Sequence, residues 1–172
     1  INISTGKYVQ GASSPTLGKS VSFELNQSGS LAWIGNDRGH IESFRIDSNH
    51  GKIQKGCRVS VAATGDQHPQ PVTSISARTS NGAETYLLIT LNSNSLQLLR
   101  VQDDFGTVIP FRAFSTEFAP VLLNCRFAPI LSYRHGTPAA AGAEDGSIVF
   151  FDLERSQKPC VNKLHAHAKP VI

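Results

Sequence analysis

Methionine is absent from this 172-residue sequence, so Ile1 is not an initiator residue. We expect either that a leader was removed or that the chain is a piece of a longer protein, and the start of a repeat at Lys169–Ile172 favours the second. No apolar run approaches the roughly 18 residues that cross a bilayer. The first residues also lack the basic start and apolar core of a secretory signal. The sequence therefore predicts neither a membrane span nor a secreted protein.

Cysteine and charge are also sparse. The three cysteines, Cys57, Cys125 and Cys160, are odd in number and far apart, which favours reduced thiols in an intracellular protein over a disulfide framework. Charged residues make up 17% of the chain, and the basic residues behind the net charge of +3 are scattered. Direct binding of nucleic acid therefore has little support. Hydrophobic residues, at 40%, predict a globular chain.

The sequence does contain a repeat of about fifty residues. Apolar stretches recur at intervals of 51, 49 and 50 residues, each marked by a valine: Val21, Val72, Val121 and Val171. A second marker follows in phase at Ile41, Leu96 and Ile148, and a third at Gly6, Gly51 and Gly106. A period in this range predicts an array of identical supersecondary units.

Each unit reads as four strands separated by turns, because apolar residues alternate or form short runs between Asn, Asp and Gly clusters. The expected strands are 21–25, 31–35, 41–46 and 53–62, then 72–77, 86–91, 96–101 and 108–114, then 121–127, 139–143, 148–153 and 160–164. The alanine run 139–143 has helical propensity, but it is short and follows Pro138, so we expect a strand there. The fold class is predicted to be all-β.

Units of four strands at this spacing are typical of β-propeller blades. We expect blades at about 20–62, 70–115 and 120–165, with 1–12 as the last strand of a preceding blade and 166–172 as the start of the next. A propeller closes with roughly four to eight blades. Three blades and a leading strand form a partial propeller, and we expect the rest of a parent chain to complete the ring.

One block of the third unit carries a family resemblance. The run GAEDGSIVFFDLE resembles the strand–turn–strand signature of the WD-repeat β-propeller family, with Asp145 as the turn aspartate and Phe151 in place of the usual tryptophan. The runs LHAHAKPV and GDQHPQPV resemble the Gly-His element before a first strand, through His167 and His68. The likeness covers essentially the whole chain and is strongest to a nuclear member of the family. It therefore implies an intracellular protein of the nucleus, with the cytoplasm as a second compartment.

The resemblance also implies a buried hydrogen-bonded corner that links the histidine, a hydroxyl of the second strand, the turn aspartate and the tryptophan. The first blade offers Asp37 and Phe44, with Leu17 at the histidine position. No blade contains the complete set. We therefore expect blade integrity to depend mainly on apolar packing.

Clusters that suggest chemistry have simpler interpretations. Cys160, His165 and His167 lie close in sequence, but no fourth ligand with zinc-like spacing is near them. Glu144 and Asp145 are adjacent, and a turn aspartate that accepts backbone N–H groups explains them without acid–base catalysis. We predict no metal site, no cofactor and no catalytic set.

Surface recognition is the remaining function. By resemblance, one face of the propeller is lined by the loops 64–70, 116–119 and 165–169 and by the turns between second and third strands. The polar candidates for binding other proteins are Asp37, Arg38, Gln67, Asn94, Glu144 and Lys169. For any one of them, an ordinary solvated turn residue is an equally good interpretation. The chain is thus predicted to be a non-enzymatic scaffold without a small-molecule substrate.

The alternative is an enzyme with its site in the central channel. First-strand residues would line that channel, namely Ser22, Phe23, Thr73, Ser74, Leu122 and Leu123. Acids and histidines are missing from these positions, which argues against catalysis there.

Overall fold

The computed structural model describes residues 4–11, 13–63, 65–80, 84–114, 121–128, 137–155 and 157–172. Their secondary structure is all-β, with three four-stranded antiparallel sheets. The first sheet contains β1 (Ser20–Leu25), β2 (Leu31–Asn36), β3 (His40–Asp47) and β4 (Lys52–Ser60). The second contains β5 (Val72–Thr79), β6 (Thr85–Leu91), β7 (Ser95–Val101) and β8 (Val108–Phe114). The third contains β9 (Leu122–Phe127), β10 (Pro138–Ala143), β11 (Ser147–Asp152) and β12 (Cys160–His165).

The predicted fold class is confirmed. Every expected strand between residues 21 and 164 is present, with ends within two residues of those expected. The alanine run forms β10, where Ala139 pairs with Phe151 on one side and Phe127 on the other. Pairing on both edges outweighs the helical propensity of alanine.

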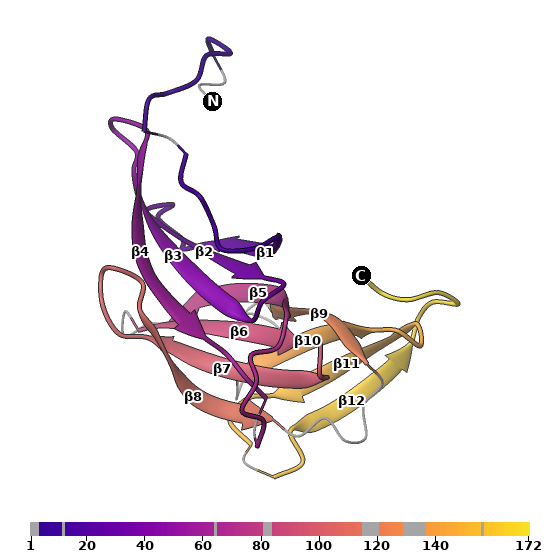
Figure 1. Ribbon diagram of the computed structural model, residues 1–172. Helices are drawn as coiled ribbons and strands as arrows, with labels where there is room; N and C mark the ends of the chain where they lie inside the picture. Colours follow the sequence, from indigo (N-terminus) through magenta and orange to yellow (C-terminus); the bar gives the residue numbers. More distant parts are fainter. Residues whose placement is uncertain are drawn as a thin grey trace.

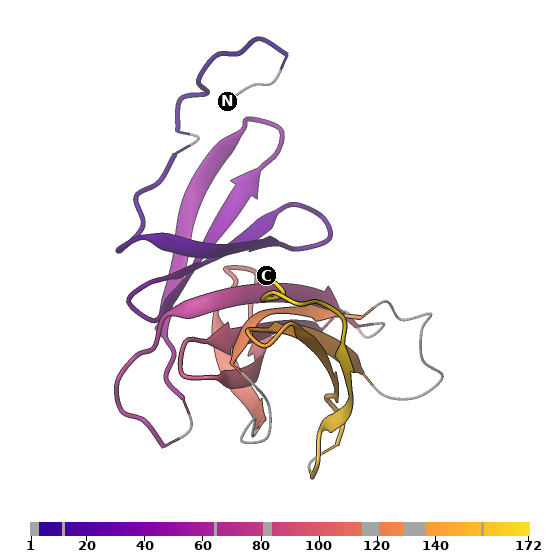
Figure 2. The same ribbon diagram turned by 90° about the vertical axis from the view of Figure 1, so that its right-hand side faces the viewer.

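The sheets follow one another around an arc (Figures 1 and 2). The first strands contact in series, β1 with β5 and β5 with β9, and lie on the inside of the arc. The fourth strands β4, β8 and β12 lie on the outside. Each sheet therefore packs face to face against its neighbour in the sequence.

Two apolar cores fill the spaces between the sheets. Trp33 and Ile41 of the first sheet pack with Leu87 and Ile89 of β6. Leu88, from the same strand, belongs to the core with the third sheet. Because β6 is covered on both faces, it reads as a continuous apolar run rather than as an alternation.

The turns between second and third strands are equivalent in the three sheets. Gly39, Asn94 and Gly146 donate their backbone N–H to the carbonyls of Asn36, Leu91 and Ala143, respectively. All three have positive φ, of 73°, 58° and 80°. Asn94 thus takes the position that glycine holds elsewhere, which asparagine tolerates better than most residues. Ile41, Leu96 and Ile148 are each the second residue of the third strand of their sheet, so the second repeat marker is confirmed.

The valine marker is wrong by one residue in two sheets. The equivalent first-strand residues are Ser20, Val72 and Leu122, which pair with Asn36, Leu91 and Ala143. A β-bulge follows each of these pairs. Val21 lies in the first bulge and Val121 precedes β9. Because the bulge lies at the same position in all three first strands, it does not cause the offset: the valine stands one residue after the equivalent position in the first sheet and one residue before it in the third.

The expected leading strand is also wrong for the described residues 4–11, which form turns and irregular backbone. Gly6 and Gly11 have φ of 66° and 80°, values that an antiparallel strand does not use. This segment lies beside β4, where the Gly11 carbonyl accepts the N–H of Ile53. At the other end, residues 166–172 are irregular, and Val171 donates its N–H to the Ala143 carbonyl at 3.0 Å.

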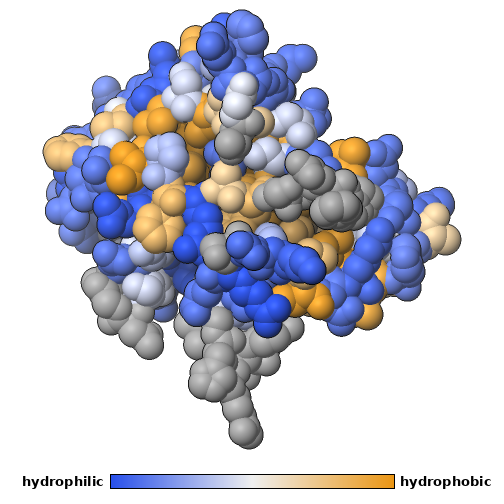
Figure 3. Space-filling model, turned by 90° about the horizontal axis from the view of Figure 1, so that it is seen from below, coloured by the Kyte–Doolittle hydropathy of each residue, from blue (hydrophilic) through white to orange (hydrophobic). Residues whose placement is uncertain are grey.

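Apolar side chains are exposed at both ends of the arc. Val21, Phe23 and Leu25 lie on one face of β1, as expected, and are 49%, 56% and 40% exposed. On β12, Val161 and Leu164 are exposed. Seen from below, hydrophobic residues show in the middle of the molecule with polar residues around them (Figure 3). No helix in the described ranges is long and apolar enough to cross a membrane.

Candidate functional site

The candidate recognition residues gather at one end of the sheets. The turns β2–β3, β6–β7 and β10–β11, and the segments that follow the fourth strands, emerge at the same end because the sheets are antiparallel meanders. The exposed candidates are Asp37, Arg38, Gln67, Glu144 and Lys169, while Asn94 is half-buried. The loop 116–119 lies outside the described residues. We call this end the loop face.

The first turn of the loop face is capped by Asn36 rather than by Asp37. The buried Asn36 side chain accepts the N–H groups of Arg38 and His40 at 3.0 and 2.9 Å and donates to the Leu17 carbonyl. Asp37 instead accepts the N–H of Lys19 at 2.9 Å, just before β1. Because Arg38 occupies the position of Asp145, the expected equivalence of Asp37 and Asp145 is wrong by one residue.

The other two turns are held by different contacts. Asn94 Oδ1 accepts the N–H of Leu122, which ties the second sheet to the start of the third. Asp145 accepts from the backbone N–H and hydroxyl of Ser147 and pairs with Lys163 at 2.8 Å. The bond from Lys163 and those from Ser147 hold the pKa of Asp145 well below its usual range. The loop face is therefore built on three turns that side-chain hydrogen bonds hold.

The two histidines assigned to the corner do not occupy buried positions. His68 is exposed and its backbone N–H bonds to Asp66, while His167 is exposed and its N–H bonds to the Gly146 carbonyl. Phe151, in contrast, is 1% exposed and packs in the core between the second and third sheets. Of the corner that the resemblance implied, the aromatic residue Phe151 is therefore buried as expected, whereas the histidines are exposed to solvent.

Hydroxyls on the first strands connect neighbouring sheets. Ser22 donates to the Val72 carbonyl at 3.1 Å, and Ser74 donates to Asn124 Oδ1 at 2.6 Å. Thr73 pairs with Thr90 within the second sheet. Of the remaining channel candidates, Leu122 is buried, Leu123 is half-buried and Phe23 faces solvent. These polar groups are engaged in structural bonds.

Titratable side chains do not converge near the end of the third sheet. Cys160, His165 and His167 are all exposed, on β12 and the segment after it. Over the part of the chain that the structure describes, no three His, Cys, Asp or Glu residues gather closely enough to hold a metal ion.

Sequence reasoning missed a buried carboxylate, Glu42 of β3. Its side chain is 1% exposed and pairs with Arg58 at 2.6 Å and Lys55 at 3.4 Å, both from β4. Burial raises its pKa, but the hydrogen bond from Arg58, the charge of Lys55 and the Leu17 N–H outweigh burial, so the pKa is lowered. A charged residue between Ile41 and Phe44 in a predicted strand is the only signal in the sequence.

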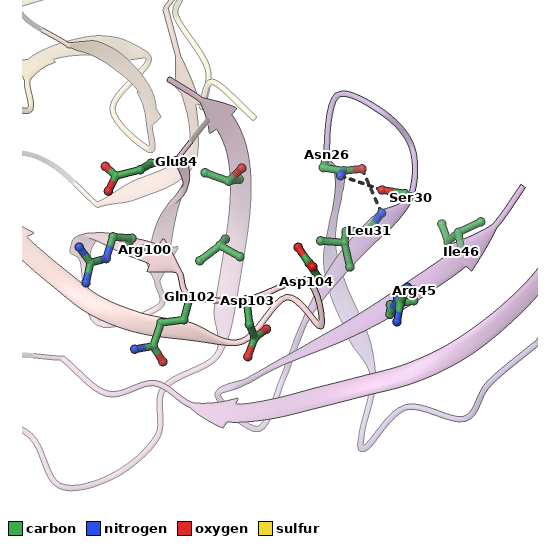
Figure 4. Close-up of a pocket in the computed structure, with 12 residues that line it drawn as sticks. Asn26, Ser30, Leu31, Arg45, Ile46, Glu84, Arg100, Gln102, Asp103 and Asp104 are labelled. Atoms are coloured by element: carbon green, nitrogen blue, oxygen red, sulfur yellow. Dashed lines mark hydrogen bonds between the residues drawn. The ribbon is translucent and has the colours of Figure 1, made fainter. Parts of the chain in front are cut away.

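A groove of about 700 Å³ opens between the first and second sheets at the end opposite the loop face (Figure 4). One wall comes from the β1–β2 loop and the end of β3, the other from β6, the end of β7 and the β7–β8 turn. Its lining is Asn26, Ser30, Leu31, Arg45, Ile46, Glu84, Thr85, Arg100, Val101, Gln102, Asp103 and Asp104. We call it the interblade groove.

A second hollow of about 470 Å³ lies at the ends of β1, β5 and β9. Its two arginines already have contacts. Arg126 forms an ion pair with Glu24, and Arg78 lies over the Phe127 ring and donates to the Ala128 carbonyl. Among the described lining residues, Arg78 makes no ion pair, but its guanidinium is taken up by the Phe127 ring and the Ala128 carbonyl.

No protein-family model matches the chain. Among solved structures it is similar to the WD40 repeats of RRP9, with a TM-score of 0.62 and 13% identity over 91% of this chain. It is similar to U3-55K, with a TM-score of 0.61 and 13% identity over 91% of this chain. It is also similar to a protein from Lactobacillus plantarum, with a TM-score of 0.63 and 15% identity over 87% of this chain. The chain spans 42% of the length of each of these structures. The three sheets are therefore blades with the WD40 β-propeller fold.

Proposed function

We propose that the chain is part of a non-enzymatic scaffold that binds other proteins through its loop face. The observation that carries the proposal is the exposure of Asp37, Arg38, Glu144 and Lys169 on turns and segments fixed at one end of three packed blades. Because hydrogen bonds already hold the turns, binding there orders the charged side chains but not the turn backbone. The structural bonds of the first-strand hydroxyls support a scaffold over a channel enzyme.

The identity and cellular place of this scaffold are part of the proposal. The runs GNDRGHIESFRID and AEDGSIVFFDLERSQKPC resemble WD repeat-containing protein 13. From that resemblance we infer a protein of the nucleus, with the cytoplasm as a second compartment. The scattered basic residues favour a protein without direct contact with nucleic acid, and the lack of a catalytic set in the sequence favours one without a cofactor or small-molecule substrate.

We also propose that residues 166–172 begin a fourth blade. Val171 packs over Gly142 as Val72 packs over Gly35, and Val72 is the first residue of β5. The same contact thus occurs where the second blade meets the first and where Val171 meets the third. The blade boundaries 20–62, 70–115 and 120–165 belong to this proposal.

The test is affinity capture with the intact protein that contains this chain, followed by quantitative mass spectrometry. We expect the double variant Arg38→Glu plus Lys169→Glu to lose specific partners of the wild type. Lys7→Glu plus Lys52→Glu, the same charge change away from the loop face, should retain them. If the loop-face variant captures the same proteins in the same amounts, the loop face is not the binding surface.

A further inference from the structure

The two walls of the interblade groove differ in charge: the first-blade wall carries Arg45, whereas the second-blade wall carries Arg100 and the three carboxylates of Glu84, Asp103 and Asp104. Arg45 projects from the end of β3 on the first-blade wall, and its guanidinium lies 5.3 Å from the centre of the Phe105 ring. Asp104 projects from the β7–β8 turn toward the wall that carries Leu31 (Figure 4). Arg45 thus supplies a positive charge on one wall and Asp104 a negative charge on the other.

These two charges lack ion-pair partners. In the described ranges, neither Arg45 nor Asp104 makes an ion pair, although both line the groove. The neighbouring Asp103 is used differently, because it accepts the N–H groups of Phe105 and Thr107 at 3.0 Å and fixes the turn. Asp104 therefore lies in a turn that Asp103 holds, and its side chain is exposed at the groove.

We propose that the interblade groove binds an extended peptide segment in which an acidic and a basic residue are adjacent. Successive side chains of an extended chain point to opposite sides. A segment lying along the groove would therefore direct its acidic residue to Arg45 and its basic residue to Asp104. The half-buried Leu31, Ile46 and Val101 would contact the aliphatic stem of the basic residue.

The composition of the groove disfavours other ligands. Only three of its twelve lining residues are apolar, unlike a typical small-molecule pocket. A polyanion would be repelled by Glu84, Asp103 and Asp104, and a uniformly basic peptide by Arg45 and Arg100. This site is separate from the loop face, because it opens at the other end of the strands.

The test uses the intact protein and four fluorescein-labelled octapeptides, with Glu-Lys, Glu-Glu, Lys-Lys or Ser-Ser at the centre of a Gly-Ser sequence. Fluorescence anisotropy gives the affinities. We expect the Glu-Lys peptide to bind the wild type at least about threefold more tightly than the others, since exposed ion pairs are individually weak. Its affinity should fall as salt is raised.

Charge reversal gives the decisive comparison. Arg45→Glu should favour the Lys-Lys peptide, and Asp104→Lys should weaken Glu-Lys binding by about threefold or more. The double reversal again has opposite charges on the two walls and should bind the Glu-Lys peptide within about twofold of the wild type. Arg45→Gln is the milder variant if a reversal disturbs folding, and it should weaken Glu-Lys binding. Arg38→Glu, on the loop face, is the matched control and should change nothing.

Two results would overturn the groove proposal. One is equal binding of all four peptides by the wild type. The other is an unchanged order of affinities in Arg45→Glu and Arg45→Gln. Neither result bears on the loop face, whose own test uses different residues and captured proteins.

Discussion

The indole N–H of Trp33 donates a 2.9 Å hydrogen bond to the carbonyl of Gly106, 73 residues later in the sequence. Around it, Ser43 donates to the Phe105 carbonyl at 2.6 Å and accepts the N–H of Cys57 at 2.8 Å. The β7–β8 turn of the second blade is thus seated against β2, β3 and β4 of the first. A similar contact recurs one blade later, where Arg112 donates to the Leu153 carbonyl at 2.7 Å.

Replacing Gly106 by alanine should open this contact. A Cβ there would lie 2.9 Å from Ser43 Cβ and 3.1 Å from Trp33 Nε1, and the φ of 78° adds backbone strain. We expect Gly106→Ala to lower the free energy of unfolding by about 2–4 kcal/mol, measured by urea denaturation followed by circular dichroism. Emission from Trp33, the single tryptophan, should shift to longer wavelength.

Gly29→Ala is the control for Gly106→Ala. Gly29 has a similar φ of 70°, but a Cβ added there would have no atom of the described residues within 4 Å. This variant should lose only about 1 kcal/mol, the strain of the left-handed conformation. Equal losses in the two variants would show that the contact with Trp33 contributes nothing.

Glu42→Gln should destabilise the first blade in a pH-dependent way. We expect a loss of about 1–3 kcal/mol at pH 7, because the bonds to Arg58 and Lys55 lose their charge on one side. The folded pKa of Glu42 is lowered from its ordinary value of 4.5. Its contribution is therefore fully present above about pH 4.5 and is lost as the pH falls through the lower folded value.

The measurement compares unfolding of wild type and Glu42→Gln between pH 7 and pH 3. The difference in free energy should shrink on acidification. Glu144→Gln, an exposed carboxylate without a described ion pair, should match the wild type throughout. A difference that stays constant down to pH 3 would contradict a stabilising charge at Glu42.

The cysteines should react with iodoacetamide in a fixed order. Cys160 is exposed, Cys57 is half-buried and accepts a bond from the Thr107 hydroxyl, and Cys125 is buried. Burial raises the pKa of Cys125 to about 12, so almost no thiolate forms near neutral pH. Peptide mass spectrometry should find Cys160 modified first and Cys125 last, only after unfolding. Early modification of Cys125 would mean that the second and third blades separate readily.

Gly142→Ala tests the packing of Val171 against the third blade. A Cβ at this position would clash with the carbonyl oxygen of Val171 and lie 2.8 Å from its Cγ1. We expect the Val171 amide, which bonds to Ala143, to exchange its hydrogen faster in the variant. The amide of Leu164, in the β11–β12 ladder, is the internal control. Unchanged exchange at Val171 would argue against the proposed start of a fourth blade.

The strands were predictable because their cause is local. Alternation in VSFEL and short apolar runs such as YLLITL, bounded by Asn, Asp and Gly, locate the strands of all three blades. The positive φ at Gly39 and Gly146 follows from residue type. Patterns of this kind can be read within one repeat, without knowledge of the contacts between repeats.

What could not be predicted depends on contacts between units. The equivalent first-strand positions hold Ser20, Val72 and Leu122, so no shared residue type marks them in the sequence. Glu42 is buried only because Arg58 and the segment before β1 meet it there. The sequence pattern favours Asp37 as the turn residue, whereas Asn36 holds the turn. That role too depends on a distant contact, because Asn36 also donates to the carbonyl of Leu17, 19 residues away. The interblade groove likewise needs two blades to exist.

The ion pair between Glu24 and Arg126 joins β1 of the first blade to β9 of the third. It reaches across the second blade, so its geometry depends on the angles of two successive blade interfaces. A smaller angle between neighbouring blades moves β1 and β9 apart, and a larger angle brings them together. The ion pair between Glu24 and Arg126 therefore reports the curvature of the three blades.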